Sequence, residues 1–230
     1  MKSLVSLTAG AIAVALVSSA NGAMIAGWTI TTAFPTGTGN VPTGQTYSVG
    51  AADQGEATAG TVLSSYHTLA AATYTSPSGN GSQYAFSSNN WSIGDYYEAR
   101  VSTANYFEPI TVSWDQARSS TGPAAFELVF SIDNGTTWTT VSSYTVLQSG
   151  GGGAPGTWSS LTYNSLYTNS FTLTGAENAG LLIVRFRSTV TAAATGSSRI
   201  DNVFIYSGAV PAPGAVALLA VAGLVSRRRR

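Results

Sequence analysis

Hydrophobic and polar residues alternate with a period of two along several stretches of the chain. Successive side chains of a β-strand point to opposite faces, so this alternation predicts strands with one buried and one solvated face. The pattern runs through the ranges 96–101, 110–115, 125–132 and 181–187. It assigns these apolar residues to the core: Tyr97, Ala99, Val101, Ile110, Val112, Trp114, Phe126, Leu128, Phe130, Ile132, Leu182, Val184 and Phe186. The polar residues between them, such as Glu98 and Asp115, are expected to face water.

Turn-forming residues separate these stretches. Asp133, Asn134 and Gly135 follow one predicted strand and predict a hairpin to a second strand in the range 138–146. The ranges 35–44, 76–82 and 148–156 are rich in Gly, Pro and Ser and predict loops. About eight to ten short strands, without a long helix between them, predict an all-β fold, namely an antiparallel β-sandwich.

The N-terminal range has the pattern of a secretory signal peptide. Lys2 supplies a positive charge, and the range 4–17 is an apolar segment of the usual length. Small residues follow it, and we expect cleavage after Ala20 or Ala23. The alternative is a buried first helix or an uncleaved anchor. We therefore assign residues 1–23 to a signal peptide that directs the chain to the export machinery.

The C-terminal range combines a proline-flanked spacer, a short apolar run over 215–225 and a basic end. The residues that define this predicted sorting motif are Val210, Pro211, Ala212, Pro213, Arg227, Arg228, Arg229 and Arg230. A helix over 214–225 is about 18 Å long against a bilayer core of roughly 30 Å, a mismatch that bilayer thinning tolerates. The positive-inside rule keeps the arginines in the cytoplasm and places the body of the protein outside.

This C-terminal pattern resembles the PEP-CTERM sorting signal of bacterial envelope proteins. That family carries Pro-Glu-Pro, a hydrophobic helix and an arginine-rich end, whereas this chain has Ala212 in place of the glutamate. The resemblance implies an exosortase, a sorting protease or transpeptidase, as partner, and initial anchoring in the membrane through the C-terminal helix. The alternative is a permanent C-terminal anchor. Residues 210–230 thus form a sorting or anchor segment, and residues 24–209 form one β-sandwich domain.

The predicted domain also resembles the jelly-roll domains of secreted and envelope bacterial proteins. The range 126–137 (FELVFSIDNGTT) matches their strand and turn, and the range 198–206 (SRIDNVFIY) matches their closing strand. The resemblance implies a jelly-roll-like sandwich and names no ligand.

Composition excludes several kinds of chemistry. The chain has no cysteine and one histidine, so thiolate and multi-histidine metal sites are ruled out. Lys2 and the four terminal arginines lie in the two end segments, which leaves five arginines against ten acidic residues in the domain. A lysine-free domain with a formal charge of −5 argues against nucleic-acid binding, which needs a basic surface.

Carboxylates suggest one candidate metal site. In related jelly-roll domains the Asp-Asn pair often lies near a structural calcium, so Asp201 is a candidate ligand. Asp53 and Glu56 are candidates to complete its oxygen shell. The alternative is that Asp201 hydrogen-bonds a neighbouring loop at a strand edge.

Catalytic patterns are weak. Asp95 with Glu98 offers a carboxylate pair of the glycosidase type, and Glu108 and Asp115 are further acids, but surface ion pairing explains Glu98 equally well. His67 could belong to a catalytic triad, but the chain contains no Gly-x-Ser-x-Gly motif to supply the nucleophilic serine. We therefore predict no enzymatic activity.

Aromatic residues give the strongest functional signal of the domain. Trp91 lies in a polar stretch, Tyr96 on the polar face of its strand, and Trp158 after the glycine-rich loop. We interpret these three as candidates for stacking on sugar rings, whereas Trp114 alternates with core residues. The sequence predicts an exported cell-surface or extracellular-matrix protein without enzymatic activity. A carbohydrate-binding module for extracellular polysaccharide is the alternative, and a polysaccharide hydrolase or lyase is a more distant one.

Overall fold

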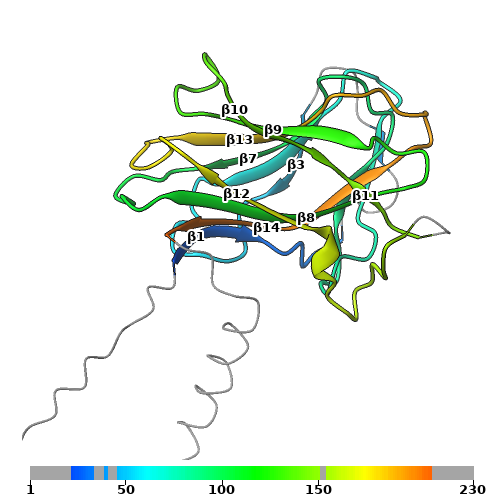
Figure 1. Ribbon diagram of the computed structural model, residues 1–230, viewed down its shortest axis with the longest axis horizontal. Coiled ribbons are helices and arrows are strands. Elements are labelled where there is room, and N and C mark those ends of the chain that lie inside the picture. Colours follow the sequence, from blue (N-terminus) through cyan, green and yellow to red (C-terminus); the bar gives the residue numbers. More distant parts are fainter. Residues whose placement is uncertain (1–21, 34–38, 41–45, 151–153, 209–230) are drawn as a thin grey trace, which may run out of the picture.

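The computed structural model describes residues 22–33, 39–40, 46–150 and 154–208. It confirms an all-β sandwich of two sheets that face each other across a shared core (Figure 1). Residues 1–21 of the predicted signal peptide and all of the C-terminal sorting segment lie outside the described residues, whereas Ala23, the last residue of that predicted peptide, lies in a described strand. Within the described ranges, no helix is long and apolar enough to cross a membrane.

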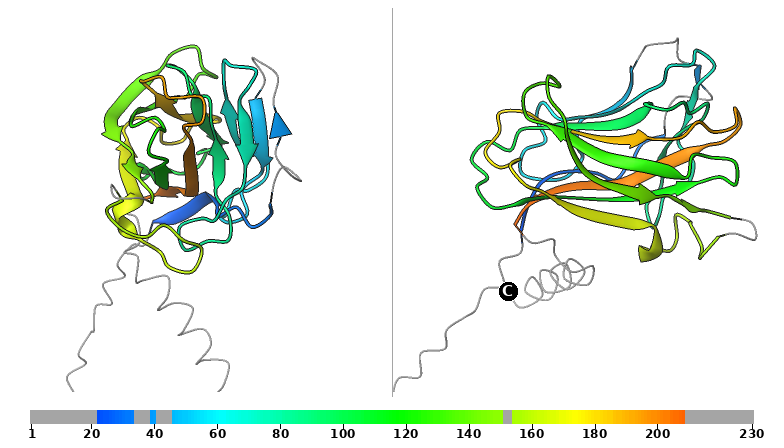
Figure 2. Two further views of the ribbon diagram at one scale, coloured as in Figure 1. Left: turned by 90° about the vertical axis from the view of Figure 1, so that its right-hand side faces the viewer. Right: turned by 45° about the horizontal axis from the view of Figure 1, so that its top comes forward.

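The first sheet contains eight of the described strands, in the order β11-β8-β14-β6-β5-β2, with β1 paired to β14 and β12 paired to β8. Its strands are β1 (Ala23–Trp28), β2 (Gly39–Asn40), β5 (Thr73–Thr75), β6 (Phe86–Ser88), β8 (Ile110–Arg118), β11 (Leu147–Gln148), β12 (Thr168–Leu173) and β14 (Ser198–Ser207). Ala23 pairs with Ser207, so the two ends of the described domain lie side by side at one edge (Figure 2).

The second sheet contains six described strands in the order β10-β9-β13-β7-β4-β3. They are β3 (Thr46–Gly50), β4 (Val62–Tyr66), β7 (Tyr96–Val101), β9 (Ala125–Ser131), β10 (Thr139–Thr145) and β13 (Leu182–Ser188). All pairs within it are antiparallel. In the first sheet, β11 pairs with β8 in parallel, so the predicted antiparallel arrangement holds with this one two-residue exception.

The core between the sheets consists of the apolar residues that alternate along the strands. Tyr97, Val112, Trp114, Phe126 and Phe186 have no more than a trace of exposed surface. The aromatic rings pack closely against one another; the ring centroids of Trp114 and Phe186, for example, are 4.7 Å apart. Burial of such large apolar surfaces supplies most of the favourable free energy of folding, because it removes that surface from water.

The alternation predicted the inward faces correctly except at Ile132, and it failed for several polar residues between them, which are buried. Ile132 was expected in the core but is 49% exposed, because β9 ends at Ser131. Asp115 and Glu98 were expected to face water and are buried, at 1% and 3% exposure. Loops and arginine side chains cover the outer faces of β8 and β7, which period-two patterning cannot foresee.

The predicted hairpin joins β9 to β10. Asn134 and Gly135 both have positive φ, at 58° and 84°, a backbone region that these two residue types tolerate best. The Asp133 carboxylate accepts hydrogen bonds from Thr137 and from the Ser131 hydroxyl, which fixes the turn. These bonds hold the pKa of Asp133 down at about 2.

The described residues contain more strands than the eight to ten predicted. The additional ones are short: β2, β5, β6 and β11 span two or three residues each. Segments of that length cannot show a periodic pattern, and their pairing depends on neighbours distant in sequence.

Candidate functional site

Trp91 does not form part of a glycan surface. Its side chain is completely buried and packs edge-on against the rings of Tyr97 and Phe126, at centroid distances of 5.0 and 5.4 Å. Its indole N–H donates to the Ser88 carbonyl oxygen. The polar sequence around Trp91 suggested a surface position, but the ring turns inward, so the prediction was wrong for this residue.

Tyr96 is half-buried on the outer face of the second sheet, with both faces of its ring covered. The Tyr66 ring stacks on one side at 5.4 Å, from the neighbouring strand β4. The Arg185 guanidinium lies 3.9 Å from the ring centroid on the other side, from β13. Trp138 covers the far face of that guanidinium at 4.1 Å. Burial raises the pKa of Tyr96. No open ring face remains for a sugar, so the prediction of Tyr96 as a stacking residue was also wrong.

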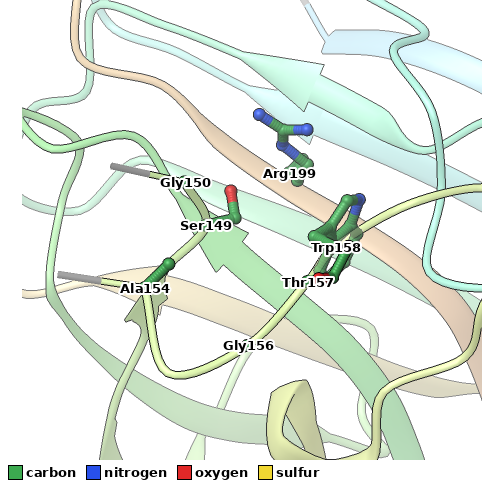
Figure 3. Close-up of a pocket in the computed structure, with 7 residues that line it drawn as sticks. All are labelled: Ser149, Gly150, Ala154, Gly156, Thr157, Trp158 and Arg199. Carbon is green, nitrogen blue, oxygen red and sulfur yellow. The ribbon is translucent and has the colours of Figure 1, made fainter. Parts of the chain in front are cut away.

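Trp158 is the predicted stacking residue whose side chain borders a cavity. It is half-buried and lines a cavity of about 420 Å³ beside β11 and β14 (Figure 3). The residues that line this cavity are Ser149, Gly150, Ala154, Gly156, Thr157, Trp158 and Arg199. Cavities of this size, with one aromatic wall and a few polar groups, are typical of small-ligand sites.

Hydrogen bonds hold the wall around Trp158 in place. The indole N–H donates to the Ser78 carbonyl oxygen at 2.8 Å, and the Tyr167 ring packs edge-on against the indole at 5.2 Å. The Tyr167 hydroxyl donates to the Gly156 carbonyl oxygen at 2.7 Å. The Asn164 amide donates to the Thr157 carbonyl oxygen. The aromatic wall is thus fixed to both the 76–82 loop and the 3-10 turn Ser165–Tyr167.

Arg199 supplies the charged group of the cavity. It lies on β14 between Ser198 and Ile200, both of which are fully buried, so its side chain points to the opposite, outer face of the first sheet. The guanidinium carbon is 5.9 Å from the Trp158 ring centroid. Burial lowers the pKa of Arg199. Arg199 was not among the predicted site residues, because a single arginine in a strand carries no pattern.

The predicted calcium ligands are not brought together. The Asp53 carboxylate accepts from the backbone and hydroxyl of Thr29, and Glu56 accepts from the Tyr106 hydroxyl. Asp201 lies elsewhere, and no group of three His, Asp or Glu side chains suited to a metal occurs in the described residues. The calcium prediction was therefore wrong in its ligand set, because residues 53 and 56 bind locally near β1 and the 103–106 turn.

Asp201 instead ties the 76–82 loop to the sheet. Its Oδ2 atom accepts from the Asn80 backbone N–H at 2.8 Å and from the Ser82 hydroxyl at 2.5 Å. Its Oδ1 atom is buried without a partner. Burial raises the pKa of Asp201 to about 7, and the neighbouring Asp115 carboxylate adds to that rise. This is the hydrogen-bonding role that the sequence left as the alternative.

Asp115 faces Asp201 across the β8–β14 pairing and has its own polar shell. Its oxygens accept from the side chains of Asn80, Thr168 and Asn202. Asn202 reaches it from a β-bulge with a positive φ of 47°, which redirects the side chain. Burial raises the pKa of Asp115 despite these bonds. The Asp-Asn pair of the closing strand thus organises a buried polar network.

His67 forms a chain of hydrogen bonds with a serine and an aspartate. Its Nδ1 atom lies 3.1 Å from Asp95 Oδ2, and its Nε2 atom lies 3.0 Å from the Ser88 hydroxyl. All three side chains are at most 2% exposed, and the Ser88 hydroxyl also contacts the Tyr97 hydroxyl in the core. The order of groups matches a catalytic triad, but the serine oxygen faces packed side chains. We therefore interpret these hydrogen bonds as stabilising the core.

The acids considered for glycosidase chemistry are engaged in separate structural roles. Burial alone would raise the pKa of Asp95, but the bonds it accepts from His67, Ser92 and Thr68 outweigh it, and the net effect is a lowered pKa. Glu98 is clamped by Arg100 and Arg185, both at 2.6 Å. Each carboxylate thus has a partner of its own.

Comparisons with known proteins give fold-level similarities. No protein-family model matches the chain, and no curated protein matches it. Among solved structures, the CBM22-1–GH10 modules of a Clostridium thermocellum endo-1,4-β-D-xylanase complexed with xylohexaose are 15% identical over 84% of this chain and 30% of that one, at a TM-score of 0.42. This chain therefore spans less than a third of the xylanase chain.

Two further structures match in a similar way. The K3 cleaved adhesin domain of Lys-gingipain from Porphyromonas gingivalis is 10% identical over 80% of this chain and all of that one, at a TM-score of 0.42. The family 11 carbohydrate-binding module of Clostridium thermocellum, in complex with a β-1,3-1,4-mixed-linked tetrasaccharide, is 13% identical to this chain. The match covers 82% of this chain and 99% of that one, at a TM-score of 0.35. The assignment of the fold rests on the strand pairing described above.

Proposed function

We propose that this chain is an exported, non-enzymatic cell-surface protein whose β-sandwich binds a glycan in the cavity beside Trp158. The observation that carries the proposal is the half-buried indole in the wall of a cavity of about 420 Å³. An indole offers a rigid apolar surface to the C–H face of a sugar ring, and the hydroxyls of Ser149 and Thr157 border the same space.

The surrounding structure favours a preorganised site. Trp158 is held by its bond to Ser78 and by the Tyr167 ring, so little side-chain entropy is lost when a ligand stacks on it. By contrast, Trp91 is in the core and both faces of Tyr96 are covered. Trp158 is therefore the one member of the predicted aromatic set that retains a role in stacking.

The non-enzymatic character is supported by the roles of the carboxylates. Asp95, Glu98, Asp115 and Asp201 are buried, and each is held by hydrogen bonds or ion pairs within the fold. Among the described residues that line the Trp158 cavity, none is acidic. A general acid for glycoside cleavage would have to lie beside the bound sugar.

The cellular location is proposed from the sequence pattern of the two ends. An N-terminal signal peptide would direct export, and the PEP-CTERM-like range 210–230 would hold the chain in the membrane until a sorting enzyme acts. Mass spectrometry of the surface-exposed protein tests this proposal. We expect a new N-terminus after Ala20 or Ala23 and loss of the range that ends in Arg230. An intact Arg230 on surface-exposed protein would contradict processing.

A glycan array probed with the full chain tests the binding function. We expect binding to a defined set of glycans, and the Trp158→Ala variant should lose about 30-fold in affinity for them, the effect of a binding hot spot worth about 2 kcal/mol. Trp138→Ala is the matched control, because it removes another half-buried tryptophan, which precedes β10 and packs on Arg185 of the second sheet. Equal losses in both variants, or no binding by the unchanged protein, would refute the proposal.

A further inference from the structure

Arg199 differs from the other arginines of the described residues. Arg100 and Arg185 bind Glu98, and Arg187 binds Glu127. Arg118 donates to three backbone carbonyl oxygens. The Arg199 guanidinium has neither a hydrogen bond nor an ion pair to any residue that the structure describes, and its Nε–H is buried without an acceptor.

An unpaired guanidinium in this position is energetically unfavourable. Burial removes water from the cation, and an arginine remains protonated under ordinary conditions. A partly buried charge is normally compensated by an opposite charge or by hydrogen bonds. Within the described residues Arg199 has neither, so the surroundings of β14 leave a positive charge available to a ligand.

The unpaired charge borders the same cavity as Trp158. Figure 3 shows the Arg199 side chain and the Trp158 indole beside one another, with Ser149 and Ala154 across from them. The guanidinium carbon and the indole centroid are 5.9 Å apart. Because no acidic side chain occurs among the described residues that line the cavity, Arg199 sets its electrostatic character.

We infer that the Trp158 cavity selects an acidic sugar, a glycan unit that carries a carboxylate, by pairing that carboxylate with Arg199 while the sugar ring stacks on Trp158. This inference rests on the proposed glycan-binding function and specifies its ligand class. A guanidinium presents two parallel N–H groups that match the two oxygens of a carboxylate, and such charge-assisted pairs are about twice as strong as neutral hydrogen bonds.

The test measures the binding of tri-galacturonate and of its fully methyl-esterified form to the full chain by titration calorimetry. The ester keeps the ring, linkage and length, removes the charge and adds one methyl group to each carboxyl group. A charge-assisted contact of about 1.5–3 kcal/mol corresponds to a preference of roughly 10- to 150-fold for the acid. We expect a preference in that range for the unchanged protein.

Three variants assign the preference to its source. Arg199→Gln should bind acid and ester equally, and Arg199→Lys should retain part of the preference as a point charge. Arg187→Gln, which removes one positive charge from the other sheet, should leave the ratio of the two affinities unchanged. Unchanged tryptophan fluorescence and melting temperature in each variant show that the fold is intact.

The outcomes separate this inference from the proposed function. If Arg199→Gln keeps the full preference, or if the ester binds as tightly as the acid, the inference is wrong. Binding of neutral glycans that Trp158→Ala abolishes would still leave the proposed function standing. If the acid binds through Arg199 and Trp158→Ala has no effect, the charge contact is supported and the stacking role is refuted. If neither trisaccharide nor any arrayed glycan binds, both proposals fail.

Discussion

Replacement of Asp201 by asparagine should change how the stability of the protein depends on pH. Asp201 is fully buried on β14, and its Oδ2 atom accepts from Asn80 and Ser82 while Oδ1 has no partner. Burial raises the pKa of its carboxyl group from 3.8 to about 7. Folding therefore favours the protonated form of this side chain.

The sign of the effect follows from the two pKa values. The folded protein keeps the Asp201 proton up to about pH 7, whereas the unfolded chain releases it near pH 3.8. Stability that is present below pH 4 is thus lost as the pH rises to about 7. At about 1.36 kcal/mol per pH unit, the total loss is about 4 kcal/mol, of which about 3 kcal/mol falls between pH 5 and pH 8.

Asp201→Asn removes this ionisation and keeps the size of the side chain. The amide nitrogen places its two N–H donors where Oδ1 stood without an acceptor, at a cost of about 1–3 kcal/mol. Relative to the unchanged protein, the variant should gain about 3 kcal/mol in the free energy of unfolding from pH 5 to pH 8. Urea denaturation of the full chain, followed by tryptophan fluorescence at both pH values, measures this difference.

Asp133→Asn serves as the control. The pKa of Asp133 is lowered to about 2 in the folded state, so its contribution is lost only on acidification below about pH 4. The stability difference for this variant should stay constant between pH 5 and pH 8. If Asp201→Asn also shows a constant difference over that range, the reasoning about the buried carboxyl group is refuted.

Three further substitutions test the packing. Gly79→Ala should lower the free energy of unfolding by about 1–3 kcal/mol, because a Cβ atom there would lie 2.6 Å from the Tyr84 carbonyl oxygen. Gly180→Ala is the control, because a Cβ atom at that position would meet no atom within 4 Å, and equal losses in both variants would contradict the clash. Trp91→Ala should cost about 3–5 kcal/mol in urea denaturation as a core cavity, and a loss below about 1 kcal/mol would argue against burial. Glu98→Gln should cost about 2 kcal/mol in the same assay because it leaves two arginines unpaired; an unchanged denaturation midpoint would rule that out.

Local patterns in the sequence predicted the fold well. The period-two residues of β7, β8, β9 and β13 point into the core as expected, with Ile132 as the exception just beyond β9. The turn at Asn134 and Gly135 was equally visible, because positive φ restricts the choice of residue. These features depend on neighbours in the sequence, so the sequence alone was sufficient to find them.

The candidate site was only partly predictable. Trp158 was recognised as an aromatic residue after a glycine-rich loop, but Trp91 and Tyr96 looked the same from their polar surroundings. Whether an aromatic ring is exposed depends on what packs over it. In the case of Tyr96 the covering groups, Tyr66 and Arg185, come from strands far away in the sequence.

By itself the sequence determined the all-β class, the hairpin and an acidic, cysteine-free domain, and it predicted segments for export at both ends. Only the tertiary structure decided which polar groups are buried and which remain unpaired. Asp201 and Asp115 meet because β14 pairs with β8, and Arg199 meets Trp158 because a loop folds back over the sheet. Such contacts are set by strand order and loop packing, which join residues that no local pattern links.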